Sequence, residues 1–341
     1  MASCVSHQSG QTRNDIVSSP SPPQSRLEAV GMGMVKEGNQ GNLQMPDTML
    51  DVKIDDALAD ALDESCVPDE LLEDMNIHEA KSMSSCADDG PVLPPLVRKT
   101  ALEFMATLAY ELRLPKSMWF LAAALLDLYC TRRTHANTIS DLRATCSALV
   151  RMLMKSDCAR LNPMPSKTLD AEEAGLLRTL DWKIVIPSIE SWLSAYCTRL
   201  NVLSKRQLVP SIVWVWAKTI SDANVLILHS PASPKLPPRK QANGLLGLAL
   251  VSARLLPLKA IATKNLCPGL WEQVLGQMKD TMSQQAEVPT CQVPDNHASH
   301  ILKWLCVSVQ ADLRNVRQDC EDVALQLHGA LGGDRGAPLH G

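Results

Sequence analysis

Few residues of this sequence stand at spacings that could carry out catalytic chemistry. The sequence has no glycine-rich phosphate loop, no nucleophile elbow of the GxSxG type and no HExxH zinc motif. One group has metal-ligating side chains, namely Cys291, His297, His300 and Cys306, but its C-x5-H-x2-H-x5-C spacing matches no standard zinc site. We therefore expect no catalytic residue, no metal, no cofactor and no small-molecule ligand.

Charge is unevenly distributed along the chain, whose formal net charge is −4. Residues 47–89 hold fourteen acidic side chains against two lysines, whereas residues 90–341 hold 28 basic and 20 acidic side chains. A basic body can bind nucleic acid, but an acidic segment that folds back onto it explains the same division. Because the densest basic pairs are only Arg132-Arg133 and Arg239-Lys240, the sequence favours a protein partner over nucleic acid.

The eleven cysteines are scattered and form no CxxC pair. In a chain of this length, that pattern indicates buried, reduced thiols in a reducing compartment. The residues after Met1 do not read as a signal peptide, and no uncharged apolar stretch reaches the ~18–20 residues that a membrane span needs. We expect a protein of the nucleus, the cytoplasm or both, with no membrane partner.

The hydrophobic pattern predicts helices after residue 95 and little structure before it. All twelve aromatic residues lie between Phe104 and Trp304, so residues 1–94 are expected to be disordered and acidic, with short helices in 47–80 forming only against a partner. Apolar residues at helical spacing predict an all-α protein. The expected helices cover 96–112, 115–130, 140–155, 169–180, 188–200, 206–222, 240–255, 269–285 and 298–328.

Within the first three of these helices, the spacing of apolar residues identifies the side that should face the core. The residues expected to point inward are Leu102, Met105, Leu108, Ala109, Leu112, Trp119, Leu121, Ala122, Leu125, Leu126, Tyr129, Leu142, Cys146, Leu149, Val150 and Leu153. The seven tryptophans are interpreted as filler of the core or of an interface rather than as a ligand box.

Several segments, in this order, resemble the cyclin family. RKTALEFMATLAYELRL at 98–114, LAAALLDLYCT at 121–131 and DLRATCSALVRMLMKSD at 141–157 resemble the first three helices of a cyclin box. EEAGLLRTLDWKIVIPS at 172–188 resembles the fifth helix and its exit, although the 18-residue separation of Lys155 and Glu173 leaves no room for a usual fourth helix. LPPRKQANGLLGLALVSARL at 236–255 is similar to a helix of the C-terminal cyclin fold.

The resemblance implies two tandem cyclin-like helical bundles preceded by the acidic segment. Its boundaries are a disordered region at 1–94, an N-terminal cyclin box at 95–190, a C-terminal cyclin-like fold at 191–328 and a flexible tail at 329–341. It also implies an ion pair between Arg98 and Asp127 that joins the first two helices. Their alternative interpretation is an unrelated, exposed arginine and aspartate.

The resemblance further implies that Lys155 and Glu173 lie at one solvent-facing edge and bind a cyclin-dependent protein kinase. Their alternative interpretation is a lysine at the end of one helix and a glutamate near the start of another, each favoured by the helix dipole. The implied function is a regulatory subunit, not an enzyme, that activates the kinase in cell-cycle control. A kinase-independent or transcription-type cyclin-fold adaptor remains the alternative.

Four Ser-Pro pairs are minimal sites for proline-directed phosphorylation. They are Ser19 and Ser21 in the N-terminal region and Ser230 and Ser233 in the later proline-rich loop. A bound and active proline-directed kinase would modify these serines within its own complex.

Overall fold

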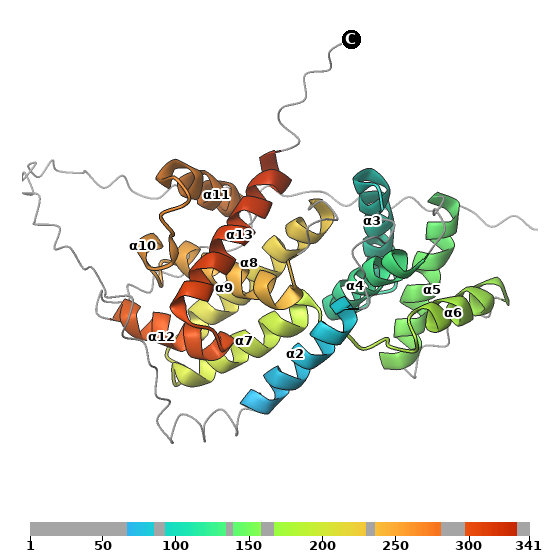
Figure 1. Cartoon of the computed structure of the whole chain (residues 1–341), viewed down its shortest axis with the longest axis horizontal. Helices are drawn as coiled ribbons and strands as arrows, with labels where there is room; N and C mark the ends of the chain where they lie inside the picture. The colour runs from blue at the N-terminus through green and yellow to red at the C-terminus, as the bar shows by residue number, and fades with distance from the viewer. Residues whose placement is uncertain are drawn as a thin grey trace, which may run out of the picture. The chain divides into compact units, whose positions relative to one another are not determined.

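The computed structural model describes residues 67–84, 93–133, 139–157, 167–229, 236–280 and 297–332. In these ranges the chain forms helices and no strand, which confirms the all-α prediction. The helices are labelled in Figure 1 and are α2 (Asp69–Ser84), α3 (Pro95–Glu111), α4 (Lys116–Arg132), α5 (Ile139–Asp157), α6 (Lys167–Thr179), α7 (Ile189–Leu203), α8 (Val209–His229), α9 (Pro238–Ser252), α10 (Leu258–Ile261), α11 (Pro268–Asp280), α12 (Ala298–Val309) and α13 (Leu313–Gly332).

Prolines and one serine mark where several helices begin. Pro95 and Pro238 occupy the first turns of α3 and α9, where their fixed φ suits the helix and their missing N–H is not needed. Ser188 caps α7: its Oγ accepts a hydrogen bond from the Ser191 amide, and the Ser191 side chain accepts one from the Ser188 amide. These local signals explain why the predicted helix starts lie close to the observed ones.

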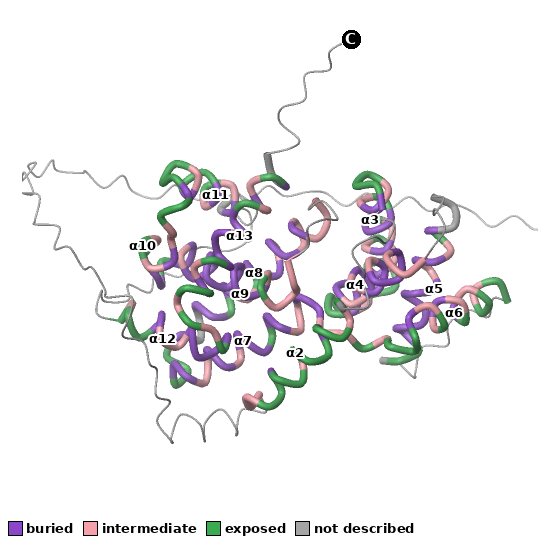
Figure 2. Tube along the Cα trace, in the orientation of Figure 1, coloured by how far each residue is buried: buried purple, intermediate pink, exposed green. Residues whose placement is uncertain are grey.

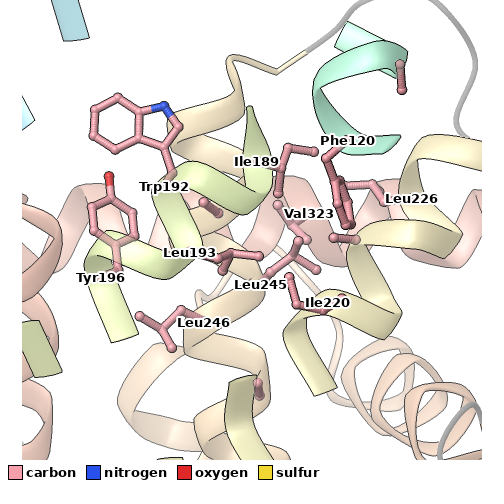
Figure 3. Packing of buried hydrophobic residues seen from close by; sticks show 14 of the residues in the cluster. Phe120, Ile189, Trp192, Leu193, Tyr196, Ile220, Leu226, Leu245, Leu246 and Val323 are labelled. Carbon is pink, nitrogen blue, oxygen red and sulfur yellow. The ribbon is translucent and has the colours of Figure 1, made fainter. Parts of the chain in front are cut away.

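Two groups of helices pack side by side. Helices α3 to α6 contact one another, and α7 to α9 contact one another together with α10 to α13. The two groups meet where α3 contacts α8 and α4 contacts α7. Phe120 of α4, Ile189 of α7 and Leu226 of α8 all belong to one cluster of buried hydrophobic residues (Figure 3).

Helix α4 is buried on most of its surface, as its run of apolar residues predicts (Figure 2). Nearly all the residues expected to point inward from α3, α4 and α5 are buried or half-buried. Leu112 is the exception, with 40% of its surface exposed. Helix α3 ends at Glu111, and the chain turns outward through Arg113, whose φ of 54° lies in the left-handed region.

Helix α9 lies at the centre of the second group and is buried along most of its length (Figure 2). Its glycines let α13 approach closely: a Cβ at Gly244 would meet Val323 Cγ2 at 2.6 Å and would also collide with the carbonyl oxygen of Asp319. A Cβ at Gly247 would lie 2.5 Å from Cys320 Sγ. Two helix backbones can pack at this separation only because these positions have no side chain.

Helix α8 is long and apolar enough, over Ser211–His229, to span a membrane by length and composition alone. It contacts α7, α9, α13 and α3, and more than half of that stretch is buried among them. Lys218 and Asp222, one turn apart, pair with each other inside this packing and are almost fully buried. The burial of α8 against other helices accounts for its apolar composition, which makes it weak evidence for a span.

The helical segment expected over 298–328 is divided in the structure into α12 and α13. Gln310 ends α12 with a φ of 51°, and Asp312 begins the next helix by accepting a hydrogen bond from the Asn315 amide at 2.7 Å. The residue types around Gln310 are compatible with a continuous helix. The turn therefore depends on the packing of α12 against α7 and of α13 against α9.

The expectation that residues 1–94 are disordered is wrong for 69–84, which form helix α2 on the second group of helices. Leu72 is 1% exposed, and Asp69 accepts a hydrogen bond of 2.5 Å from the fully buried Arg199 of α7. Glu79 Oε2 accepts hydrogen bonds from the indole N–H of Trp192 at 2.7 Å and from the amide of Arg239 at 3.0 Å. The partner that an acidic helix needs is thus the chain's own body.

Burial raises the pKa of Glu79, and the two hydrogen bonds and the nearby Arg239 only partly oppose that effect. Residues 1–66, 85–92 and 333–341 of the expected disordered regions lie outside the described ranges. Residues 329–332, which were expected to belong to a flexible tail, form the end of α13.

The described cysteines are all free thiols. Cys130, Cys146, Cys197, Cys306 and Cys320 are buried, and Cys267 is exposed. Burial raises the pKa of Cys146 to about 12 and that of Cys306 to about 11. These buried thiols therefore stay protonated at neutral pH and act as small apolar side chains.

A first prediction concerns the α9–α13 contact. Gly244→Ala should destabilise the protein by about 1–3 kcal/mol, because the new methyl group overpacks a backbone contact that cannot move freely. Gly276→Ala in α11 is the matched control, since a Cβ there meets nothing within 4 Å; it should be neutral or stabilising by about 0.5–1 kcal/mol. Urea unfolding followed by circular dichroism measures both. Equal effects at the two glycines would contradict the close approach.

A second prediction concerns Glu79. Because its pKa in the folded protein is raised above 4.5, its contribution to α2 docking is largest below pH 4.5 and falls as the pH rises through the folded-state pKa. Glu79→Gln keeps an acceptor for Trp192 and Arg239 and removes the titration. Hydrogen exchange of residues 69–84, corrected for intrinsic rates, should show weaker protection at neutral pH than near pH 4.5 in the wild type. That part of the pH dependence should be absent in the glutamine variant.

Candidate protein-binding site

The structure joins Arg98 and Asp127 through two hydrogen bonds. Arg98 Nε lies 2.8 Å from Asp127 Oδ1, and Arg98 Nη2 lies 2.9 Å from Asp127 Oδ2. The remaining guanidinium nitrogen, Nη1, donates to the carbonyl oxygen of Ile227 in α8 at 2.5 Å. The Arg98 side chain is 5% exposed and that of Asp127 is 19% exposed. This arginine therefore links α3, α4 and α8, and the last of these contacts was not apparent from the sequence.

Lys155 and Glu173 belong to a cluster of four charged side chains between α5 and α6. Lys155 Nζ donates to Glu173 Oε2 at 2.5 Å, and Arg151 Nε lies 3.2 Å from Glu173 Oε1. Arg151 Nη2 also donates to Asp170 Oδ1 at 2.6 Å. Helical spacing creates the cluster. Arg151 and Lys155 stand four positions apart on one side of α5, and Asp170 and Glu173 stand three apart on the facing side of α6.

The expectation of a solvent-facing edge is wrong for Glu173, which is only 8% exposed. The closest partner of Glu173 is Lys155 itself. The sequence interpretation omitted Arg151, which stands one helical turn before Lys155 and holds the second carboxylate oxygen. A carboxylate is tolerated in a buried position only beside cationic neighbours, and Arg151 and Lys155 supply them for Glu173.

Lys155 keeps the capacity to bind a partner. Its side chain is 41% exposed, and an ammonium group has three N–H donors, of which the bond to Glu173 uses one. Lys155 can therefore donate to a further acceptor, such as a backbone carbonyl of another protein, without releasing Glu173.

An exposed tryptophan follows α6 in the chain. Trp182 is 70% exposed and Val185 is 76% exposed. Asp181 and Trp182 both have left-handed φ angles, 55° and 59°, and the Trp182 amide donates to the carbonyl oxygen of Leu177 at 2.8 Å. The indole therefore lies outside the core, and Trp182 is not one of the tryptophans that fill it. Large exposed aromatic side chains are typical anchors of protein interfaces.

A shallow groove lies between α3 and α5. It is lined by Val97, Thr100, Ala101, Phe104, Leu142, Arg143 and Cys146. The Arg143 guanidinium lies 5.9 Å from the centre of the Phe104 ring. The groove therefore combines apolar walls with a cation at its rim.

The remaining sequence candidates lie partly or wholly outside the described residues. All four candidate phosphorylation sites, Ser19, Ser21, Ser230 and Ser233, fall outside them, as does Cys291. His297 and His300 are exposed, while Cys306 is buried. Within the described ranges, no group of three His, Cys, Asp or Glu side chains is placed to hold a metal ion.

A third prediction concerns the Arg98–Asp127 pair. Asp127→Asn should destabilise the protein by about 3–5 kcal/mol, since it leaves a buried guanidinium without its anion. Arg98→Met should also destabilise, because it removes the donors to Asp127 and to the Ile227 carbonyl. The double variant should lose less than the sum of the single losses, since the two residues interact directly. Urea unfolding of all four proteins measures the coupling, and additive losses below about 0.5 kcal/mol each would contradict it.

Comparison with models of known protein families and with curated proteins finds no match to this chain.

Proposed function

We propose that this protein is a cyclin-like regulatory subunit that binds a cyclin-dependent protein kinase and activates it. The proposal rests on the ordered resemblance of five segments to cyclin helices and on the all-helical fold. The observation that carries it is the surface formed by α5, α6 and the turn after α6. That surface presents Lys155, with unused donors, on the same helical hairpin as the exposed Trp182.

Binding at this surface combines an apolar anchor with a directional charge. Burial of an exposed tryptophan against a partner supplies most of the affinity in many interfaces. The Lys155 ammonium donates to carbonyl or carboxylate oxygens at the edge of the contact, and such charge-assisted hydrogen bonds are stronger than neutral ones. Glu173, held by Arg151, keeps the lysine in place.

Activation would be a shift of population in the kinase. A regulatory subunit that binds one arrangement of the kinase C helix and activation segment more tightly than the other favours that arrangement. The favoured state has the catalytic Lys–Glu pair and the Mg²⁺ ligands assembled. This chain contributes no catalytic group, and its place of action is the nucleus, the cytoplasm or both.

One observation favours the alternative of a kinase-independent or transcription-type adaptor. Lys155 and Glu173 already satisfy each other within the chain, so their pairing needs no kinase to explain it. Under the adaptor hypothesis, the pair only fastens α5 to α6, and Trp182 binds another class of protein.

A fourth prediction tests the kinase-binding surface. Trp182→Ala should weaken kinase binding by about 30-fold or more, which corresponds to at least 2 kcal/mol for an interface anchor. Lys155→Ala should also reduce binding. Neither should change the helical spectrum. Trp182→Ala should leave the melting temperature nearly unchanged, because Trp182 is largely exposed. Lys155→Ala should lower it slightly, because Glu173 loses its closest cation and keeps Arg151. Co-purification with a cyclin-dependent kinase and phosphorylation of histone measure the effects.

Two controls separate this outcome from unfolding. Leu325→Ala removes an apolar side chain that is 48% exposed on α13, in the second group of helices, and should leave kinase binding unchanged. Glu173→Gln should lower stability, because Arg151 and Lys155 lose the buried carboxylate that lies between them. If Trp182→Ala and Lys155→Ala both bind and activate the kinase as the wild type does, the adaptor function replaces the proposal.

A further inference from the structure

One end of the second group of helices can be identified from contacts alone. Glu79 contacts Trp192 near the start of α7 and Arg239 at the start of α9, so these two helices begin at the same end. Arg199, in the second half of α7, donates to the carbonyl oxygen of Val307 near the end of α12. Arg317, near the start of α13, donates to the carbonyl oxygen of Ala260 in α10, shortly after α9 ends. Helices α7, α9 and α12 therefore finish together, where α13 begins (Figure 1).

This end, formed by residues 204–208, 253–266 and 310–317, has an excess of positive charge and is called the basic end below. Six exposed basic residues lie on it and make no ion pair with a described residue: Lys205, Arg206, Arg254, Lys259, Lys264 and Arg314. Arg317 is half-buried beside them. Asp312 is the exposed acidic residue in these segments, and its carboxylate already caps α13.

Helix dipoles do not account for this charge. Cations are favoured at helix C-termini, which suits Lys205, Arg206 and Arg254. Arg314 and Arg317, however, lie in the first two turns of α13, where the positive end of the dipole disfavours them and favours an anion. Lys259 and Lys264 lie on and after the four-residue helix α10. The arrangement as a whole is suited to a polyanion.

The chain's own acidic segment reaches the described structure at this same end. Val67 and Asp69 bind Arg199: the Val67 carbonyl oxygen accepts a hydrogen bond of 3.0 Å, and Asp69 forms the ion pair. Residues 47–66, which come directly before, contain seven acidic residues and one lysine. A stretch of this length can extend up to about 70 Å, so all of the basic end is within its reach.

We propose that the acidic segment 47–66 occupies the basic end of the second group of helices and shields it from other polyanions. The number of acidic residues in the segment is close to the number of basic residues on that end. Attachment through Val67 gives the segment an effective concentration of about millimolar at the basic end. A free polyanion of similar affinity must exceed this concentration to displace the segment. The ion pair of Asp69, at the start of α2, with Arg199 continues the same interaction along the chain. The proposal does not depend on kinase binding.

The test compares the full-length chain with a variant in which the seven acidic residues of 47–66 become Asn or Gln. Helix α2, with Asp69 and Glu79, stays unchanged, and circular dichroism checks the fold. Acetylation of lysines by an amine-specific reagent, followed by mass spectrometry, reports the accessibility of Lys205, Lys259 and Lys264. Lys116 and Lys167, exposed on α4 and α6, are the matched controls.

The three lysines of the basic end should react about threefold or more slowly in the wild type than in the variant, while the control lysines react equally in both. High salt should remove the protection in the wild type, since ~1 M salt shortens the Debye length to ~3 Å. A carbodiimide should cross-link segment 47–66 to at least one of the three lysines. A 20-nucleotide single-stranded DNA should bind the variant about tenfold more tightly than the wild type.

Equal acetylation of the three lysines in both proteins at low salt, without cross-links, would overturn the proposal. Equal DNA binding by the two proteins would also overturn it, and would assign the basic end to an external nucleic acid. The salt dependence of acetylation in the wild type decides the matter even if the variant does not fold.

Discussion

The contact on which the arrangement of the helices depends most is made by one buried arginine. Arg98 places three of its nitrogens on partners from two other helices: both oxygens of Asp127 in α4 and the backbone carbonyl of Ile227 in α8. Its guanidinium is planar and cannot lose its charge, so the position is stable only while all these acceptors are present. The need to satisfy this one charge therefore fixes α3 against α4 and connects the first group of helices to the second.

A second constraint comes from glycine. The apolar residues of α9 would suit many arrangements of a buried helix, but Gly244 and Gly247 admit α13 at a distance that no larger residue allows. The missing side chains at these two positions determine that α13 packs against this face of α9. The apolar residues of α9 require only that the helix is buried against some partner. Arg98 and these glycines together explain how a chain with few aromatic residues specifies one packing arrangement.

Charge organises the surface of this protein in two different ways. Between α5 and α6, two cations surround a buried carboxylate, and the lysine keeps donors for a partner. On the second group of helices, acidic α2 is attached through Arg199 and through the hydrogen bonds of Glu79. An exposed tryptophan, Trp182, follows α6 in the chain. The second arrangement attaches the acidic helix α2 to the basic second group of helices, so segments of opposite net charge in the sequence are in contact in the folded chain.

The sequence by itself determined the helices and most of their buried faces, because both depend on local spacing: apolar residues at helical period, prolines in first turns, and Ser188 as a cap. The contact of Arg98 with Asp127 was expected only from the resemblance to cyclins, and the folded chain forms it. Only the tertiary structure decided what depends on distant partners. Examples are Ile227 as the third acceptor of Arg98, the inward turn of Glu173 toward Arg151, the exposure of Trp182 and the docking of α2. Each requires burial or a charge supplied by a residue far along the chain, and a pattern of neighbouring residues contains no information about that residue's position.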